Sequence, residues 1–367
     1  MPRAGMAALA FALGLVACAP DRAAPSVPEV TIPEPATGSS AHAVAAAPSA
    51  FDWSKVDGNH AVAEGFVRAG ASLLVLAHPH RMIGNGTRIA RPLERAGCDG
   101  FGAVVEALGG AVAVCHHDGA ARLLRLDRPG ALPLELPPAV AAQRVGSRAR
   151  PRPLVLAGDT TNLAVYDGTS VHRGDGASWR SAGVGPLPES VMRARVEPRR
   201  ALLAAGHLAL VYALPSGIVV PSIDLESGAV TDLGRLVAPA AIESFGVSPD
   251  GEPWCVVAGP SPGVSRFVSV GGHAVRPIAG LPEVPGPVVA FAFAPAGEVI
   301  VLSEARGVLR VRGTTVTELM PGWPARLRGE AVEVVGASVW VATREAGLLR
   351  VELESGRTEH VPLPILP

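Results

Sequence analysis

One pattern recurs along most of this chain and constrains its fold more than any other feature: short runs of alternating apolar residues separated by glycine-containing turns. The clearest copy spans Val288 to Pro324, where four such runs are separated by Pro295-Ala296-Gly297, by Glu304 to Gly307 and by Gly313-Thr314. Period-two alternation between turns of this kind is typical of consecutive antiparallel strands. Four strands in about forty residues, repeated along a chain, predict the blade of a β-propeller.

A glycine opens the second run of most copies, and its recurrence gives the repeat length. These glycines are Gly70, Gly110, Gly206, Gly251, Gly297 and Gly336. Successive glycines lie about 40 to 46 residues apart, except for one interval of roughly twice that length. We place a further copy in this interval, with Arg152 to Ala157 (RPLVLA) as its second run. The sequence therefore predicts an all-β fold, a propeller of seven four-stranded blades, with six or eight blades as alternatives.

The predicted blade boundaries follow from this spacing. They are residues 59–98, 99–142, 143–188, 189–239, 240–285, 286–324 and 325–367. The stretch 184–200 (VGPLPESVMRARVEPRR) interrupts the pattern between the third and fourth blades, and we predict a loop or an insertion there.

Two of the copies resemble repeats of known propeller families. Phe245 to Gly251 (FGVSPDG) is similar to the first-strand and turn motif of WD40-like and TolB-type repeats, in which Ser-Pro-Asp-Gly forms a tight turn. Val339 to Val351 (VWVATREAGLLRV) resembles the repeat of two-component-regulator and streptogramin-lyase-like propellers. Each resemblance covers one repeat and implies the fold, which hosts unrelated activities.

The N-terminus has the features of a targeting segment. Arg3 supplies a short positive region, and Ala7 to Val16 is apolar but too short to cross a bilayer as a helix. Leu15-Val16-Ala17-Cys18 resembles the lipobox of bacterial lipoproteins, which implies cleavage before Cys18 and acylation of its thiol. By the sorting rule of that family, Ala19 after the cysteine favours the outer membrane, facing either the periplasm or the cell surface. An ordinary secretory signal with an incidental cysteine is the alternative.

Residues 19–58 are predicted to be a disordered linker. The stretch up to Ala50 is rich in Pro, Ala and Ser, and such a composition buries too little apolar surface to offset the entropy of ordering. The predicted domains are thus a lipoprotein signal peptide at 1–18, a linker at 19–58 and the propeller at 59–367. The linker would hold the propeller away from the membrane.

Polar residues follow the second run of several blades. In a propeller the loop after each second strand lies at the same end as the connection to the next blade, so these residues converge from distant parts of the chain. The candidate binding face consists of His78, His80, His116, His117, Asp118, Asp159, Glu304, Arg306 and Arg344. Imidazole and carboxylate groups suit a transition metal, but their spacing matches no strong ligand motif. We favour a polar rim without a cofactor.

The cysteines carry a further expectation. In an oxidising compartment a disulfide between Cys98 and Cys115 is chemically allowed, although the spacing does not give the distance between their Cα atoms. Cys255 follows Trp254 in an apolar strand and is expected to be a buried free thiol.

Composition and motifs narrow the function. The formal net charge of −1 argues against a nucleic-acid partner, which would require a basic face. The sequence lacks a nucleophile elbow, a phosphate-binding glycine loop and a zinc-ligand helix. We therefore favour an envelope lipoprotein that binds a protein or glycan partner and is not an enzyme. The alternative is a propeller lyase or hydrolase that acts on a glycan or cyclic peptide through the histidine-rich loops.

Overall fold

The computed structural model describes most of the chain from Phe51 onward. The described residues are 51–56, 63–69, 72–77, 81–84, 88–90, 98, 100–117, 120–126, 132–144, 154–198, 200–215, 217–237, 242–259, 261–271, 274–295 and 297–361. The predicted signal peptide, including Cys18, lies outside this part of the chain, as does most of the predicted linker.

Seven antiparallel sheets follow one another along the chain, and each consists of consecutive strands. The first three blades hold β1 (Ala63–Ala69), β2 (Ser72–Ala77), β3 (Arg81–Gly84) and β4 (Arg88–Ala90); β5 (Gly100–Ala107), β6 (Gly110–His117), β7 (Ala120–Arg125) and β8 (Leu132–Leu134); β9 (Val155–Gly158), β10 (Leu163–Tyr166), β11 (Ser170–Gly174) and β12 (Trp179–Gly183). The fourth and fifth hold β13 (Arg200–Ala204), β14 (His207–Leu214), β15 (Gly217–Asp224) and β16 (Val230–Val237); β17 (Ile242–Val247), β18 (Pro253–Ala258), β19 (Val264–Gly271), β20 (Ala274–Pro277) and β21 (Val284–Pro285). The last two hold β22 (Val288–Phe293), β23 (Val299–Ser303), β24 (Gly307–Arg312) and β25 (Thr315–Glu318); β26 (Gly329–Val335), β27 (Ser338–Thr343), β28 (Gly347–Glu352) and β29 (Thr358–Val361).

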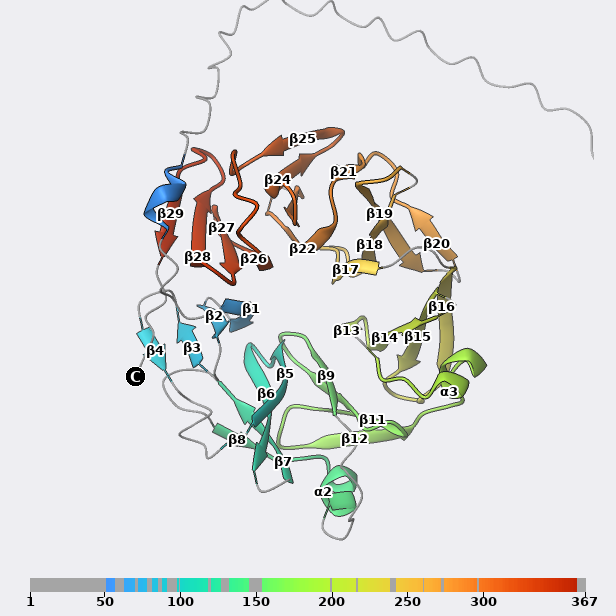
Figure 1. Cartoon of the computed structure of the whole chain (residues 1–367). Helices are drawn as coiled ribbons and strands as arrows, with labels where there is room; N and C mark the ends of the chain where they lie inside the picture. The colour runs from blue at the N-terminus through green and yellow to red at the C-terminus, as the bar shows by residue number, and fades with distance from the viewer. Residues whose placement is uncertain are drawn as a thin grey trace, which may run out of the picture. The chain divides into compact units, whose positions relative to one another are not determined.

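The first strand of each blade contacts the first strands of both neighbouring blades. These contacts run from β1 to β5, β9, β13, β17, β22 and β26 and return to β1, so the ring is closed (Figure 1). The prediction of a seven-bladed β-propeller is therefore confirmed, and every described strand lies within the blade predicted for it.

The second strands form the apolar interior of the blades. All five residues of β23 are buried, and so are all four of β10, because both faces of the sheet pack against neighbouring blades. Alternation is consequently lost in these strands, as expected for a sheet that is covered on both sides. The alternating pattern persists in partly exposed strands such as β7.

The assignment of the third blade requires a correction. We predicted that Arg152 to Ala157 forms a second strand, but this run leads into β9, which is the first strand of its sheet. The second strand is β10, and the turn before it contains Asp159 to Asn162 in place of the glycine used elsewhere. The Asp159 carboxylate accepts hydrogen bonds from the backbone N–H groups of Thr161 and Asn162, which stabilises this turn.

Asp159 consequently lies at the other end of the propeller from the face that we predicted for it. The Leu108 N–H, in the turn between β5 and β6, donates to the Asp159 carbonyl oxygen at 2.8 Å. Both residues thus belong to the end formed by turns between first and second strands. We call the opposite end, which carries the turns between second and third strands and the connections between blades, the second-turn end.

In the described part of the chain, three short helices lie outside the blades. They are the 3₁₀ turn η1 (Trp53–Lys55), α2 (Pro138–Arg144) between β8 and β9, and α3 (Glu189–Ala194) between β12 and β13. The last lies in the stretch for which we predicted a loop or insertion. Within the described residues, none of the helices is long and apolar enough to cross a bilayer.

Residues 51–56 fall within the predicted linker, yet they pack against the propeller. The ring of Trp53 lies edge-on to that of Trp323, with centroids 5.6 Å apart, and Phe51 packs against Trp53 in turn. The Trp53 indole N–H donates to the Pro321 carbonyl oxygen at 3.4 Å, and Arg326 donates to the Trp53 carbonyl oxygen. This N-terminal segment is therefore held by the connection between the sixth and seventh blades.

A disulfide joins Cys98 to Cys115, with their Cα atoms 5.5 Å apart. It connects the residue just before β5 to the interior of β6, next to the interface with the first blade. Cys255 is free and buried, and burial raises the pKa of its thiol, so it behaves as a small apolar side chain.

Gly307 offers a test of the packing around Trp323. A Cβ at this position would lie 2.4 Å from the Trp323 ring, whereas a Cβ at Gly336 would meet nothing within 4 Å. Both glycines have positive φ, so alanine at either site costs about 1 kcal/mol of backbone strain. We expect Gly307→Ala to lower the free energy of unfolding by a further 1–3 kcal/mol, roughly the cost of overpacking. Urea denaturation of the two variants measures this difference, and equal losses would contradict it.

Candidate functional site

Three residues of the predicted face lie at the second-turn end as expected. Glu304 and Arg306 are in the turn between β23 and β24, and Arg344 is in the turn between β27 and β28. The Arg306 guanidinium pairs with Glu318 at 3.2 Å, and that of Arg344 pairs with Glu330 at 2.7 Å. Both arginines are thus engaged within their own blades, at exposed positions where such pairs contribute little stability.

The histidines of the predicted face are only partly described. His116 and His117 belong to β6 and not to the loop that follows it, while His78, His80 and Asp118 lie outside the described residues. Over the described part of the chain, no group of three or more His, Cys, Asp or Glu side chains could hold a metal ion. A catalytic role for the histidine-rich loops stays a prediction.

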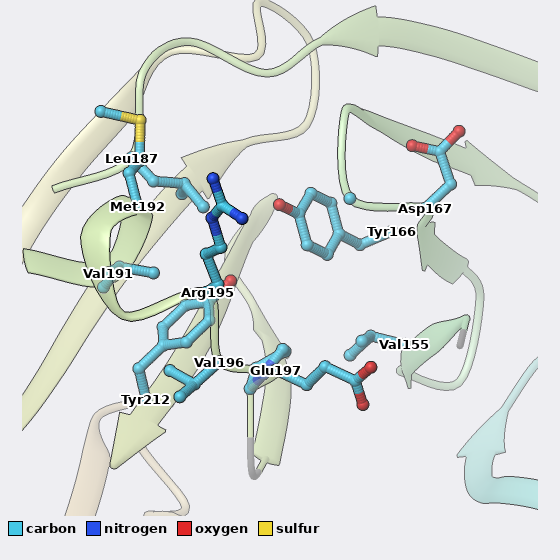
Figure 2. A pocket seen from close by; sticks show the side chains of 12 residues that line it. Val155, Tyr166, Asp167, Leu187, Val191, Met192, Arg195, Val196, Glu197 and Tyr212 are labelled. Atoms are coloured by element: carbon cyan, nitrogen blue, oxygen red, sulfur yellow. The ribbon is translucent and has the colours of Figure 1, made fainter. Parts of the chain in front are cut away.

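A pocket of about 580 Å³ opens between the third and fourth blades at the second-turn end (Figure 2). Its volume falls in the range of roughly 300–1,000 Å³ that is common for ligand sites. We call it the tyrosine pocket, and its lining residues are Val155, Tyr166, Asp167, Gly168, Leu187, Val191, Met192, Arg195, Val196, Glu197, Pro198 and Tyr212.

The two tyrosines of the chain form the inner wall of this pocket. Tyr166 ends β10 and Tyr212 lies in β14, so each comes from the second strand of its blade. Their exposed fractions are 4% and 2%. Burial raises the pKa of the Tyr212 hydroxyl, and the neighbouring Tyr166, with which it shares a hydrogen bond, raises it further. Tyr212 therefore stays neutral. The two hydrogen-bonded hydroxyls are polar groups in an otherwise apolar part of the pocket lining.

Asp167, in the turn after β10, is held by its own blade. One carboxylate oxygen accepts hydrogen bonds from the backbone N–H groups of Thr169 and Ser170 at 2.8 and 2.7 Å. The other oxygen lies 3.3 Å from the imidazole Nε2 of His172, whose Nδ1 contacts the Ser181 hydroxyl at 2.7 Å. His172 is completely buried, so this chain of contacts crosses the interior of the blade from β10 to β12.

The outer wall of the pocket comes from the insertion around α3. Val191 is buried against the fourth blade, while Met192 and Val196 are 52% and 37% exposed. Among the described residues, only Leu132 is another large hydrophobic side chain that is exposed to this degree. Exposed apolar side chains at the mouth of an aromatic pocket mark a surface that can bind a partner.

Two other cavities are less suited to recognise a ligand. One, of about 580 Å³, is lined by residues of the innermost strands, including Phe66, Phe291, Glu106 and Glu333, and both glutamates have partners within the protein. The other, of about 620 Å³, lies along β11 and β12 and is lined mainly by polar side chains such as Ser181. Neither combines an aromatic wall with exposed apolar side chains at its mouth.

The sequence interpretation missed the tyrosine pocket. Two signals were present: the only two tyrosines lie in adjacent blades, and the repeat is interrupted between these blades. The incorrect strand order in the third blade hid the first signal, because Tyr166 was then not at the end of a second strand.

No family model matches the sequence, and no curated protein matches it. Solved structures that resemble the chain include the hydrazine synthase of Kuenenia stuttgartiensis, with a TM-score of 0.50 and 12% identity over 82% of this chain and 98% of that one. Another is Saccharomyces cerevisiae Sqt1, with a TM-score of 0.49 and 10% identity over 84% and 86%. A third is YCF48 bound to a D1 peptide, with a TM-score of 0.45 and 14% identity over 68% and 76%. At these identities the likeness concerns the fold alone.

The Asp167 network predicts a specific pH dependence. Burial raises the pKa of Asp167, but the hydrogen bonds from Thr169, Ser170 and His172 outweigh burial and hold it below the ordinary value. A lowered pKa in the folded state stabilises the protein above the unfolded-state pKa of about 3.9, and this stabilisation is lost as the pH falls through the folded-state value. We expect Asp167→Asn to cost about 1–3 kcal/mol at pH 7 and progressively less below about pH 4.

The control is Asp175→Asn. Asp175 accepts the same kind of turn hydrogen bonds, from the N–H groups of Ala177 and Ser178, but it is exposed and has no histidine partner. Unfolding curves measured between pH 3 and pH 8 should show the larger loss for the Asp167 variant. A loss that does not change with pH would show that the charge of Asp167 contributes nothing to stability.

Proposed function

We propose that this chain is a lipid-anchored β-propeller of a bacterial cell envelope that binds a protein partner through the tyrosine pocket. The observation that carries the proposal is the pair of exposed apolar side chains, Met192 and Val196, beside a pocket walled by Tyr166 and Tyr212. Binding of a partner would remove this apolar surface from water. Each Å² of apolar surface buried contributes about 25 cal/mol to the binding free energy, before the costs of association are subtracted.

The position of the pocket supports this proposal. It lies where the chain departs from its own repeat, in the connection between β12 and β13, whereas the blades supply a rigid frame around it. Binding residues commonly lie on such connections because the frame fixes them without constraining their sequence. A protein partner is favoured over a glycan because the mouth of the pocket carries the exposed apolar side chains of Met192 and Val196.

The support for a membrane anchor comes from the sequence. The resemblance of Leu15 to Cys18 to a lipobox, followed by a segment rich in Pro and Ala, supports acylation of Cys18 and a tethered propeller in the outer membrane.

Capture from solubilised envelopes tests the pocket. The purified full-length chain is used as bait in envelopes of the bacterium from which it comes, and the bound material is identified by mass spectrometry. Met192→Ser combined with Val196→Ser should reduce recovery of the partner at least tenfold, because apolar anchors at an interface often contribute more than 1 kcal/mol each. Both residues are at the surface, so the fold should lose no more than about 0.5 kcal/mol per change.

Leu132→Ser is the matched control, since Leu132 is exposed but lies in β8, outside the pocket. The proposal requires one protein that is retained by this control and lost by the double variant. Equal recovery with all three baits would rule out the pocket, and recovery of a polysaccharide alone would rule out a protein partner.

Metabolic labelling tests the anchor separately. Cells that express the chain are supplied with an alkyne analogue of palmitate, and we expect the wild-type protein to incorporate it. Cys18→Ser should abolish both the label and the recovery of the protein in the membrane fraction. Label that persists in this variant, or a wild-type protein without label, would contradict acylation at Cys18.

A further inference from the structure

Arg195 occupies an unusual backbone position at the tyrosine pocket. It caps the C-terminus of α3 with φ 51° and ψ 36°, the left-handed conformation, and its N–H donates to the Val191 carbonyl oxygen. A residue with a Cβ pays roughly 1–2 kcal/mol for this conformation, and glycine is the usual choice at such a cap. This backbone places the Arg195 guanidinium over the pocket, and in Figure 2 it faces the hydroxyl of Tyr166.

The Arg195 side chain is unpaired within the described part of the chain. Its neighbour Arg193, on the same short helix, forms an ion pair with Glu189. No carboxylate of the described residues pairs with Arg195, and this includes Glu197, which also lines the pocket. In Figure 2 the Glu197 carboxylate lies at the other end of the pocket from the Arg195 guanidinium.

Asp167 does not supply a counter-charge for Arg195. Its carboxylate is occupied by the turn hydrogen bonds and by His172, and in Figure 2 it points away from Arg195. The pocket thus presents one positive and one negative group at separate places, with the nearly buried Tyr166 and Tyr212 in its wall and the exposed Met192 at its mouth. Arg195 and Glu197 are exposed in the free protein, so their pairing with a ligand strengthens only where the ligand excludes water from them.

From this arrangement we infer that the occupant of the tyrosine pocket is a short peptide segment in which an acidic and a basic residue flank an apolar one. The acidic carboxylate pairs with Arg195, the basic group pairs with Glu197, and the apolar side chain packs on the tyrosines and on Met192. The inference rests on the proposed function, because it specifies which segment of a protein partner the pocket selects. Complementary charges of this kind determine specificity more than affinity.

Selection from random heptapeptides displayed on phage tests the inference with the immobilised full-length protein. Peptides recovered on the wild-type protein should be enriched in Asp or Glu and in Lys or Arg around an apolar residue. Selection on Arg195→Gln should lose the acidic preference alone, and selection on Glu197→Gln should lose the basic preference alone. Arg193→Gln is the matched control, because Arg193 is already paired with Glu189 and lies outside the pocket lining.

Synthetic peptides then give the size of the effect. A selected peptide should bind Arg195→Gln about three- to tenfold more weakly than the wild type, with a smaller difference at high salt, and should bind Arg193→Gln unchanged. Equal affinities for the wild type and Arg195→Gln would overturn the inference.

The outcome also separates this inference from the proposed function. Enriched peptides that are apolar but lack the two charges, and that are lost by the variant carrying Met192→Ser and Val196→Ser, would overturn the inference and leave the pocket as a binding site. No enrichment over that double variant would overturn both.

Discussion

The contact between the seventh and first blades is the interaction on which the ring depends. Each sheet is made of consecutive strands, and among the described strands none pairs the first blade with the seventh through backbone hydrogen bonds. Closure comes from side chains, with Ala63 and Val75 of the first blade packed against Ala342 and Leu348 of the seventh. A contact made by side chains is specified by shape and apolar area.

Two further features stabilise blades near this contact. The disulfide between Cys98 and Cys115 lies in the second blade beside the first, and the N-terminal segment around Trp53 packs where the sixth and seventh blades join. The third and fourth blades lie elsewhere in the ring, and their connection accommodates an insertion with a helix. The candidate site is thus located where the repeat is interrupted and where closure of the ring does not constrain it.

The architecture could be predicted from the sequence because the pattern of one blade recurs in most of the chain. Glycine turns such as those at Gly297 and Gly336 set the strand order, and one error in the third blade did not change the number of blades. That error arose because hydrogen bonds to the Asp159 carboxylate stabilise the turn before β10, where other blades have a glycine. The glycine that marks the second strand elsewhere was therefore missing. A turn can be stabilised by side-chain hydrogen bonds in place of a glycine, and a prediction based on glycine spacing then fails at that turn.

The candidate site was harder to predict, because it depends on which side chains meet across two blades. Tyr166 and Tyr212 are 46 residues apart, and their hydroxyls come together only when β10 and β14 are placed in adjacent sheets. The direction of the Arg195 side chain depends on a left-handed backbone conformation. An arginine does not predict this conformation, because glycine is the residue that usually adopts it. Packing across blades and backbone conformation are properties of the fold that alternation and spacing do not encode.

The aromatic stack at Trp53 has a mechanical consequence. A force applied through the chain that precedes Phe51 reaches Trp53, Trp323 and the hydrogen bond to Pro321 before it reaches β1. These contacts pass the load into the connection between the sixth and seventh blades, so part of it bypasses the first strand. In a propeller held by its N-terminal segment, the first strand would therefore bear only part of the tension until this aromatic anchor gives way.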